Sequence, residues 1–127
     1  MKVTINDILN AVPVMRELAD TSMKIKTAYK VSKIMSAIDK EYQLFQEART
    51  KLIEKYGDRN ENHELKIDDN GNYSIPPENI SNFNEELNEI LVETVELNVN
   101  PLSIDELDNN DFTPNKMISL MPFMSEE

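Results

Sequence analysis

Apolar or semi-polar residues recur with a seven-residue period between Thr27 and Tyr56, a stretch that contains no Gly or Pro. The two rows are formed by Ala28, Met35, Tyr42, Arg49 and Tyr56, and by Val31, Ile38, Phe45 and Leu52. This spacing gives the a and d positions of a heptad repeat and predicts one long helix. The apolar stripe is widened by Ile34, Ala48 and Ile53, which favours packing within a small bundle. The same seam permits self-association of two copies through the long helix.

A second helical pattern covers residues 4–20 and precedes the long helix. Thr4 and Asp7 have the spacing of a capping box, which satisfies free backbone N–H groups in a first turn. Because Pro13 removes a backbone hydrogen bond, we expect a kink or a break there. A corner at residues 20–22 then makes the two helices a hairpin, and Gly57 is expected to close the long helix in a left-handed conformation.

Short alternating segments predict strands in the second half of the chain. Residues 64–67 and 72–75 alternate around Asp-Asp-Asn-Gly, after a polar loop over residues 58–64, and this pattern is typical of a β-hairpin. Residues 94–100 also alternate, with Val95, Leu97 and Val99 on one side. Together the three segments predict a small three-stranded antiparallel sheet, since a hairpin alone is marginally stable.

Further short helices complete the expected fold. Residues 78–93 have helical spacing, with apolar residues at Ile80, Phe83, Leu87, Ile90 and Leu91. Ser103 and Glu106 predict a capped helical turn, residues 109–111 a loop, and Thr113-Pro114 the start of a helix over residues 114–121. The fold class is therefore α+β, a single domain over residues 1–127. It comprises a helical hairpin over 1–57 and an acidic half over 58–127.

Charge and composition restrict the classes of partner. The 127-residue chain has no Cys and a net charge of −11. Residues 1–57 carry ten Lys/Arg against seven Asp/Glu, whereas residues 58–127 carry three against seventeen. Lys24, Lys26, Lys30 and Lys33 are interpreted as solvated or paired with the acidic half. We expect no binding to nucleic acid or to membranes, because both need a basic or long apolar surface, and we expect a cytoplasmic protein.

The sequence offers few groups for catalysis. His63 is the single histidine and lies in a polar loop, and the chain has two glycines, Gly57 and Gly71, both at predicted turns. A phosphate-binding loop needs several such flexible positions. We therefore expect no enzymatic activity, no catalytic residue and no cofactor.

One segment partly resembles a calcium-binding loop. Asp58, Asn60 and Asn62 alternate after a helix, as the first ligands of an EF-hand do. The sixth position of the loop is His63, where the sharp turn needs Gly, and the ninth is Lys66. A solvated loop is the preferred interpretation, and calcium binding is kept as a minor alternative.

Two sets of residues are candidates for binding a protein partner. The first is an acidic ridge, which could imitate a row of phosphates or could be an ordinary solvated helix face: Glu85, Glu86, Glu89 and Glu93. The second is an apolar cluster near the C-terminus, which could dock a partner or close the core: Met117, Met121, Phe123 and Met124.

The order of these features resembles small proteins of unknown function encoded by tailed bacteriophages and prophages of low-GC Gram-positive bacteria. The resemblance spans nearly the whole chain and rests on TAYK, EAR-x-KL-x-EKYG and VELNVNPLSIDEL. It implies a phage or mobile-element protein and carries no catalytic residue.

Our hypothesis is a non-enzymatic, phage-encoded protein-interaction module. In one version it inhibits a host defence or nucleic-acid enzyme through the acidic ridge. In the other it is a virion or tail assembly component, or an accessory factor, that binds a phage structural protein through the long helix and the C-terminal cluster.

Overall fold

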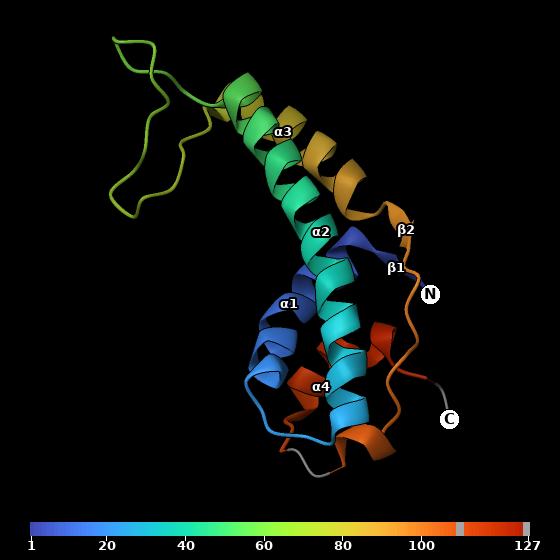
Figure 1. Cartoon of the computed structure of the whole chain (residues 1–127). Coiled ribbons are helices and arrows are strands. Elements are labelled where there is room, and N and C mark those ends of the chain that lie inside the picture. The colour runs from blue at the N-terminus through green and yellow to red at the C-terminus, as the bar shows by residue number, and fades with distance from the viewer. Residues whose placement is uncertain (109–110, 126–127) are drawn as a thin grey trace. The chain divides into compact units, whose positions relative to one another are not determined.

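The computed structural model describes residues 1–108 and 111–125, so most of the loop expected at 109–111 lies outside the described residues. The chain divides into two compact units, which we call unit 1 (Met1–Gln43 with Glu93–Glu127) and unit 2 (Leu44–Val92). The long helix α2, Ile25–Tyr56, contributes its first part to unit 1 and its last part to unit 2 (Figure 1). These boundaries differ from the division at residue 57 that charge and pattern indicate.

In unit 1 the chain begins its first helix as predicted. Helix α1 spans Ile5–Ala19, and Thr4 caps it: the Asp7 N–H donates to Thr4 Oγ1 at 3.0 Å, and the Thr4 N–H donates to Asp7 Oδ2 at 3.0 Å. The predicted break at Pro13 is wrong, because α1 continues through it. Pro13 is exposed while Val12 and Val14 are buried. Pro13 therefore lies on the exposed side of α1, and the buried Val12 and Val14 hold the flanking turns in the core.

The prediction of a three-stranded sheet is also wrong. The described residues form a two-stranded antiparallel sheet, which lies in unit 1. Strand β1, Lys2–Thr4, was not predicted and pairs with β2, Thr94–Glu96, with Val3 opposite Val95. The strand expected over 94–100 ends early because its partner is only three residues long. Beyond β2, the Leu97 N–H still donates to the Met1 carbonyl at 2.7 Å.

Most fully buried apolar side chains lie in unit 1. Of the eighteen found among the described residues, two lie in unit 2, Phe45 and Ile53. Unit 1 is closed by the C-terminal segment: α4, Pro114–Leu120, starts at the predicted cap Thr113, and the 3₁₀ turns η1 and η2 span Asp105–Leu107 and Met121–Phe123. The predicted turn after Ser103 is thus confirmed as η1. Leu102 and Phe123 are both 0% exposed, and the Leu102 N–H donates to the Phe123 carbonyl at 2.9 Å.

Unit 2 contains the end of α2 and helix α3, Pro77–Leu91. Helix α3 stops two residues earlier than predicted, with Val92 as its C-cap, so Glu93 lies beyond it. The left-handed conformation expected at Gly57 is wrong, because positive φ occurs only at His63 and Gly71 among the described residues. Gly57 is required for space: a Cβ there would clash with the Ile53 carbonyl oxygen and lie 2.7 Å from Leu65 Cδ2.

The predicted hairpin forms two compact turns with isolated bridges, and it does not form a ladder. Asn60 Oδ1 accepts from the N–H groups of Asn62 and Glu64 at 2.9 and 3.0 Å. Asp68 Oδ1 accepts from Asn70 and Asn72 in the same way, also at 2.9 and 3.0 Å. His63 (φ 63°) and Gly71 (φ 81°) occupy equivalent positions in the two turns. Side-chain oxygens thus take N–H groups that a longer β-ladder would use.

Candidate protein-interaction surfaces

Helix α3 carries four Glu and no Lys or Arg. Glu85 and Glu89 are exposed, as predicted for a ridge, and Glu78 lies on the same side by helical spacing although the sequence pattern did not single it out. Val92 has 61% of its surface exposed and continues this side, three and seven residues after Glu89 and Glu85. We call Glu78, Glu85, Glu89 and Val92 the acidic face of α3.

The two other ridge residues are placed differently. Glu86 is turned toward α2, where Oε1 lies 3.2 Å from Lys55 Nζ. The pKa of Glu86 is lowered, mainly by a hydrogen bond from the Tyr56 hydroxyl and next by the bond from Lys55. The pKa of Lys55 is raised, mainly by its bond to Glu86. Glu93 lies in unit 1, where its carbonyl accepts from the Ile5 N–H at 3.0 Å. The ridge is therefore not one helical surface.

The apolar side of α3 is incompletely covered. None of its residues is fully buried, and Ile80 is 44% exposed. Phe83 makes an edge contact with Tyr56, the ring centroids being 6.5 Å apart. In the neighbouring loop, Ile67 and Tyr73 pair across a bridge and are 59% and 46% exposed. Unit 2 therefore leaves apolar surface in water on several elements.

The C-terminal apolar cluster is split between core and surface. Phe123 is fully buried, and Met117 and Met124 are half-buried. Met121 is 63% exposed, as is Ile118 three residues earlier. The part of the cluster that a partner can reach is therefore an exposed pair, Ile118 and Met121, of which the sequence pattern identified one member.

The loop that resembles an EF-hand uses its oxygens internally. Asp58 Oδ2 lies 3.3 Å from Lys66 Nζ, and its Oδ1 accepts from the Arg59 N–H at 2.9 Å. Asn60 caps its turn, as described above. Among residues 1–108 and 111–125 no group of three His, Cys, Asp or Glu is placed to hold a metal ion.

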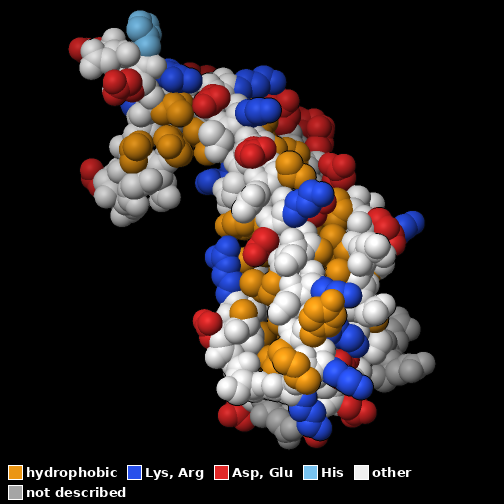
Figure 2. Space-filling model, viewed as in Figure 1, with side chains coloured by type: hydrophobic (Ala, Val, Ile, Leu, Met, Phe, Trp, Pro, Cys, Tyr) orange, Lys and Arg blue, Asp and Glu red, His pale blue; other side chains and the backbone are white. Residues whose placement is uncertain are grey.

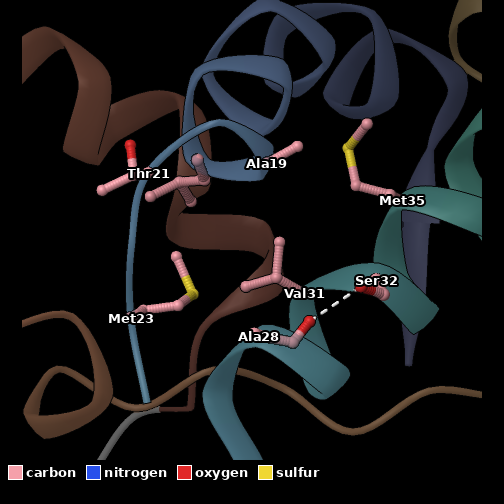
Figure 3. A pocket seen from close by; sticks show the side chains of 8 residues that line it. Ala19, Thr21, Met23, Ala28, Val31, Ser32 and Met35 are labelled. Carbon is pink, nitrogen blue, oxygen red and sulfur yellow. Dashed lines mark hydrogen bonds between the residues drawn. The ribbon is translucent and has the colours of Figure 1, made fainter. Parts of the chain in front are cut away.

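Unit 1 has a small apolar cavity between the end of α1 and the start of α2, with a volume of about 240 Å³. It is lined mainly by Leu18, Met23, Val31 and Met35 (Figure 3). The hydroxyls of Thr21 and Ser32 both donate to carbonyls one turn back, at 2.9 and 2.8 Å. Both hydroxyls in the lining are therefore already donated to the helix backbone, and the rest of the lining is apolar.

A larger open groove of about 500 Å³ lies on the outer side of α2 in unit 1. Its lining comes from α2 and from the segment after β2: Tyr29, Ser32, Lys33, Ser36, Ala37, Asn98 and Val99. Tyr29 is 64% exposed, and Lys33 Nζ lies 4.7 Å from the centre of its ring. Figure 2 shows Lys and Arg side chains around hydrophobic ones over this part of α2.

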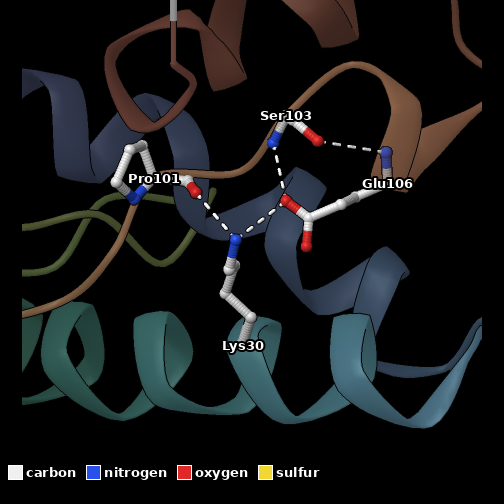
Figure 4. A network of polar contacts seen from close by, with 4 residues as sticks. All are labelled: Lys30, Pro101, Ser103 and Glu106. Atoms are coloured by element: carbon white, nitrogen blue, oxygen red, sulfur yellow. Dashed lines mark hydrogen bonds and ion pairs between the residues drawn. The ribbon is translucent and has the colours of Figure 1, made fainter.

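An ion-pair network holds one wall of the groove in place (Figure 4). Lys30 Nζ donates to the Pro101 carbonyl at 3.2 Å and to Glu106 Oε1 at 2.8 Å. The Ser103 N–H also donates to Glu106 Oε1, at 2.9 Å. Burial raises the pKa of Glu106, but the bonds from Lys30 and Ser103 outweigh it, so that the pKa is lowered. The predicted pairing of an N-terminal lysine with the acidic half is confirmed for Lys30.

Comparison of the chain with protein-family models, curated proteins and solved structures finds no match. Within the part of the chain that the structure describes, every helix is too short or too polar to cross a membrane. The candidate surfaces are therefore judged on their own geometry.

Proposed function

We propose that this protein is a non-enzymatic, phage-encoded protein-interaction module and that the acidic face of α3 is its main contact. The observation that supports this most is the exposed Val92 beside three exposed carboxylates, none of which belongs to an ion pair among the described residues. A single exposed apolar side chain is ordinary on a protein surface, and it is the row of three carboxylates outside any such ion pair, continued by Val92 on one side of α3, that suits contact with a charged partner.

The chemistry of this face selects a basic protein surface as the partner. Each exposed ion pair contributes at most about 1 kcal/mol, so three carboxylates give steering and selectivity more than affinity. Apolar contact at Val92, at the end of the acidic face, would have to supply part of the rest. A basic nucleic-acid-binding surface of a host enzyme has the required charge, which agrees with inhibition of a host defence or nucleic-acid enzyme.

The test is capture of partners from uninfected and phage-infected host lysate by the tagged full-length protein. The variant Glu78→Lys/Glu85→Lys/Glu89→Lys should lose its partner, and binding by the wild type should weaken steeply with salt. The matched control is Glu61→Lys/Glu64→Lys/Asp69→Lys, which makes the same charge change in the exposed loop of unit 2. Equal capture by both triple variants would reject the acidic face as the contact.

A second candidate function is virion or tail assembly, and it is favoured by the exposed pair Ile118 and Met121. Here the partner is a phage structural protein recovered only from infected lysate. Met121→Glu should abolish its capture with little dependence on salt. If Met121→Glu captures as much as the wild type, this candidate is rejected.

A further inference from the structure

Three lysines follow one line along the outer side of α2 in unit 1. Lys26, Lys33 and Lys40 are spaced by seven residues, and all three are exposed. Seven residues are two helical turns, so the ammonium groups recur about every 10 Å along the helix. Among the described residues none of the three forms an ion pair, in contrast to Lys30.

The lysine line runs beside the open groove described above. Lys33 belongs to both, and its contact with the Tyr29 ring keeps its ammonium group at the groove without neutralising it. Ala37 and Val99 make part of the lining apolar. The groove can therefore take an apolar side chain and, beside it, a negative charge.

The far wall of the groove offers free backbone groups. The segment after β2 makes no backbone hydrogen bond at residues 98–100 within the described part of the chain. It is held along α2 by the bonds of Lys30 to Pro101 and Glu106. The segment bends at Val99 and is not a strand edge, so its open N–H and C=O groups can form single hydrogen bonds with an added peptide and not a β-ladder.

We propose that this groove binds an extended acidic peptide segment of a partner protein. An Asp or Glu of the peptide pairs with Lys33, an apolar side chain next to it packs on Tyr29 and Val99, and its backbone forms single hydrogen bonds with residues 98–100. Lys26 and Lys40 attract further carboxylates on either side. The site lies in unit 1 and is independent of the acidic face of α3.

A peptide fits these observations better than nucleic acid or an anionic membrane. Nucleic-acid binding at physiological salt commonly uses six to ten phosphate contacts, of which this line offers about three. Phosphate oxygens can accept from the open N–H groups of the wall but have no donor for its open C=O groups, whereas a peptide backbone can bond to both. A net charge of −11 also opposes binding to extended polyanions.

The test is selection from a random dodecapeptide display library on the full-length protein, with Lys33→Glu as the counter-selection target. Enriched peptides should combine Asp or Glu with an apolar residue. Lys33→Glu and Tyr29→Ala should each weaken the best peptide at least tenfold. Lys24→Glu is the matched control and should change the affinity less than twofold, because Lys24 is exposed but lies outside the groove lining.

Backbone amide NMR of the labelled protein with the best peptide adds a second readout. Shifts should concentrate at residues 98–100 and at Lys33. The proposal is overturned if no peptide is enriched, if the enriched peptides lack acidic residues, or if Lys33→Glu and Lys24→Glu bind alike. It is also overturned if a DNA duplex or phosphatidylserine vesicles bind in a Lys33-dependent manner while peptides do not.

Discussion

Replacing Glu106 by Gln tests the network that holds residues 101–106 against α2. Gln has the same shape and keeps an acceptor oxygen, so the substitution removes the charge and leaves the space filled. In the wild-type protein, Glu106 Oε1 accepts from Lys30 Nζ at 2.8 Å and from the Ser103 N–H at 2.9 Å. Hydrogen bonds to charged groups contribute about 1.5–3 kcal/mol and neutral ones about 0.5–1.5.

The expected loss of unfolding free energy follows from this difference. The Ser103 bond would change from the charged to the neutral class and lose about 1–1.5 kcal/mol if it were fully shielded from water. Lys30 stays charged, so its bond would lose only the ion-pair part, about 1 kcal/mol at most. The side chains of Lys30 and Glu106 are 29% and 23% exposed, so screening reduces the effect. We expect about 1 kcal/mol at pH 7, which corresponds to a fall in Tm of roughly 4 °C.

The assay is urea unfolding followed by circular dichroism at pH 7 and at pH 3. Because the pKa of Glu106 is lowered in the folded state, its contribution is complete above the ordinary value of 4.5 and is lost as the pH falls through the lowered pKa. The difference between wild type and Glu106→Gln should therefore shrink at pH 3. Lys30→Met should show a similar loss, and the double variant should lose less than the sum of the two.

Two results would refute this reasoning. Equal midpoints of wild type and Glu106→Gln at pH 7 would mean that the network contributes nothing. An unchanged difference at pH 3 would mean that the charge of Glu106 is not the cause.

Four other expectations concern the fold. Pro13→Ala should stabilise the protein by about 2 kcal/mol. A proline inside a helix costs about 3 kcal/mol, but replacing it also gives the unfolded chain more conformational entropy, which offsets part of the gain. A lower urea midpoint for the variant would contradict this. Gly71→Ala should destabilise the protein by about 1 kcal/mol through its positive φ alone, because no atom lies within 4 Å of the added Cβ. His63→Gly should stabilise it by about 0.5 kcal/mol, because glycine adopts the positive φ of this position without strain. Urea midpoints measure both effects. Phe123→Ala should cost about 3–5 kcal/mol by the same measurement, and a value below 1 would place its ring outside the core. Added calcium should leave Tm unchanged, because Asp58 is already bound to Lys66; a rise in a thermal scan would show a calcium site.

Several local signals in the sequence were reliable, although the local expectations at Pro13 and Gly57 were wrong. Both capping boxes, the long uninterrupted helix and the Asn-Gly turn depend on residues within one or two turns of each other, and all are present. Three of the four predicted d positions are buried, Val31, Ile38 and Phe45, and the fourth, Leu52, is half-buried. The a positions Met35, Tyr42 and Tyr56 are only half-buried.

The other failures arise where a distant segment or a side chain competes for the hydrogen bonds that the local pattern predicts. The three residues of β1 carry no pattern that distinguishes a strand from the residues before a helix. Their partner strand lies about ninety residues further along the sequence. At the expected hairpin, the Asn60 and Asp68 side chains took hydrogen bonds that the alternating pattern assigns to strands. For the acidic ridge, spacing alone could not show that α3 ends at Leu91 or that Glu86 turns to Lys55.

The pairing of β1 with β2 has a consequence for the order of folding. Unit 1 is assembled from both ends of the chain, and unit 2 lies between them in sequence. Contacts of unit 2 join residues fewer than fifty positions apart, whereas the sheet closes a loop of about ninety residues and α1 packs against α4 from the last fifteen. On a ribosome, the α2–α3 pair can therefore form while α1 still lacks most of its cover. The seven buried residues of α1 lack the cover of α4 until residues 114–120 have been made, and this interval is when α1 is most open to aggregation or chaperone binding.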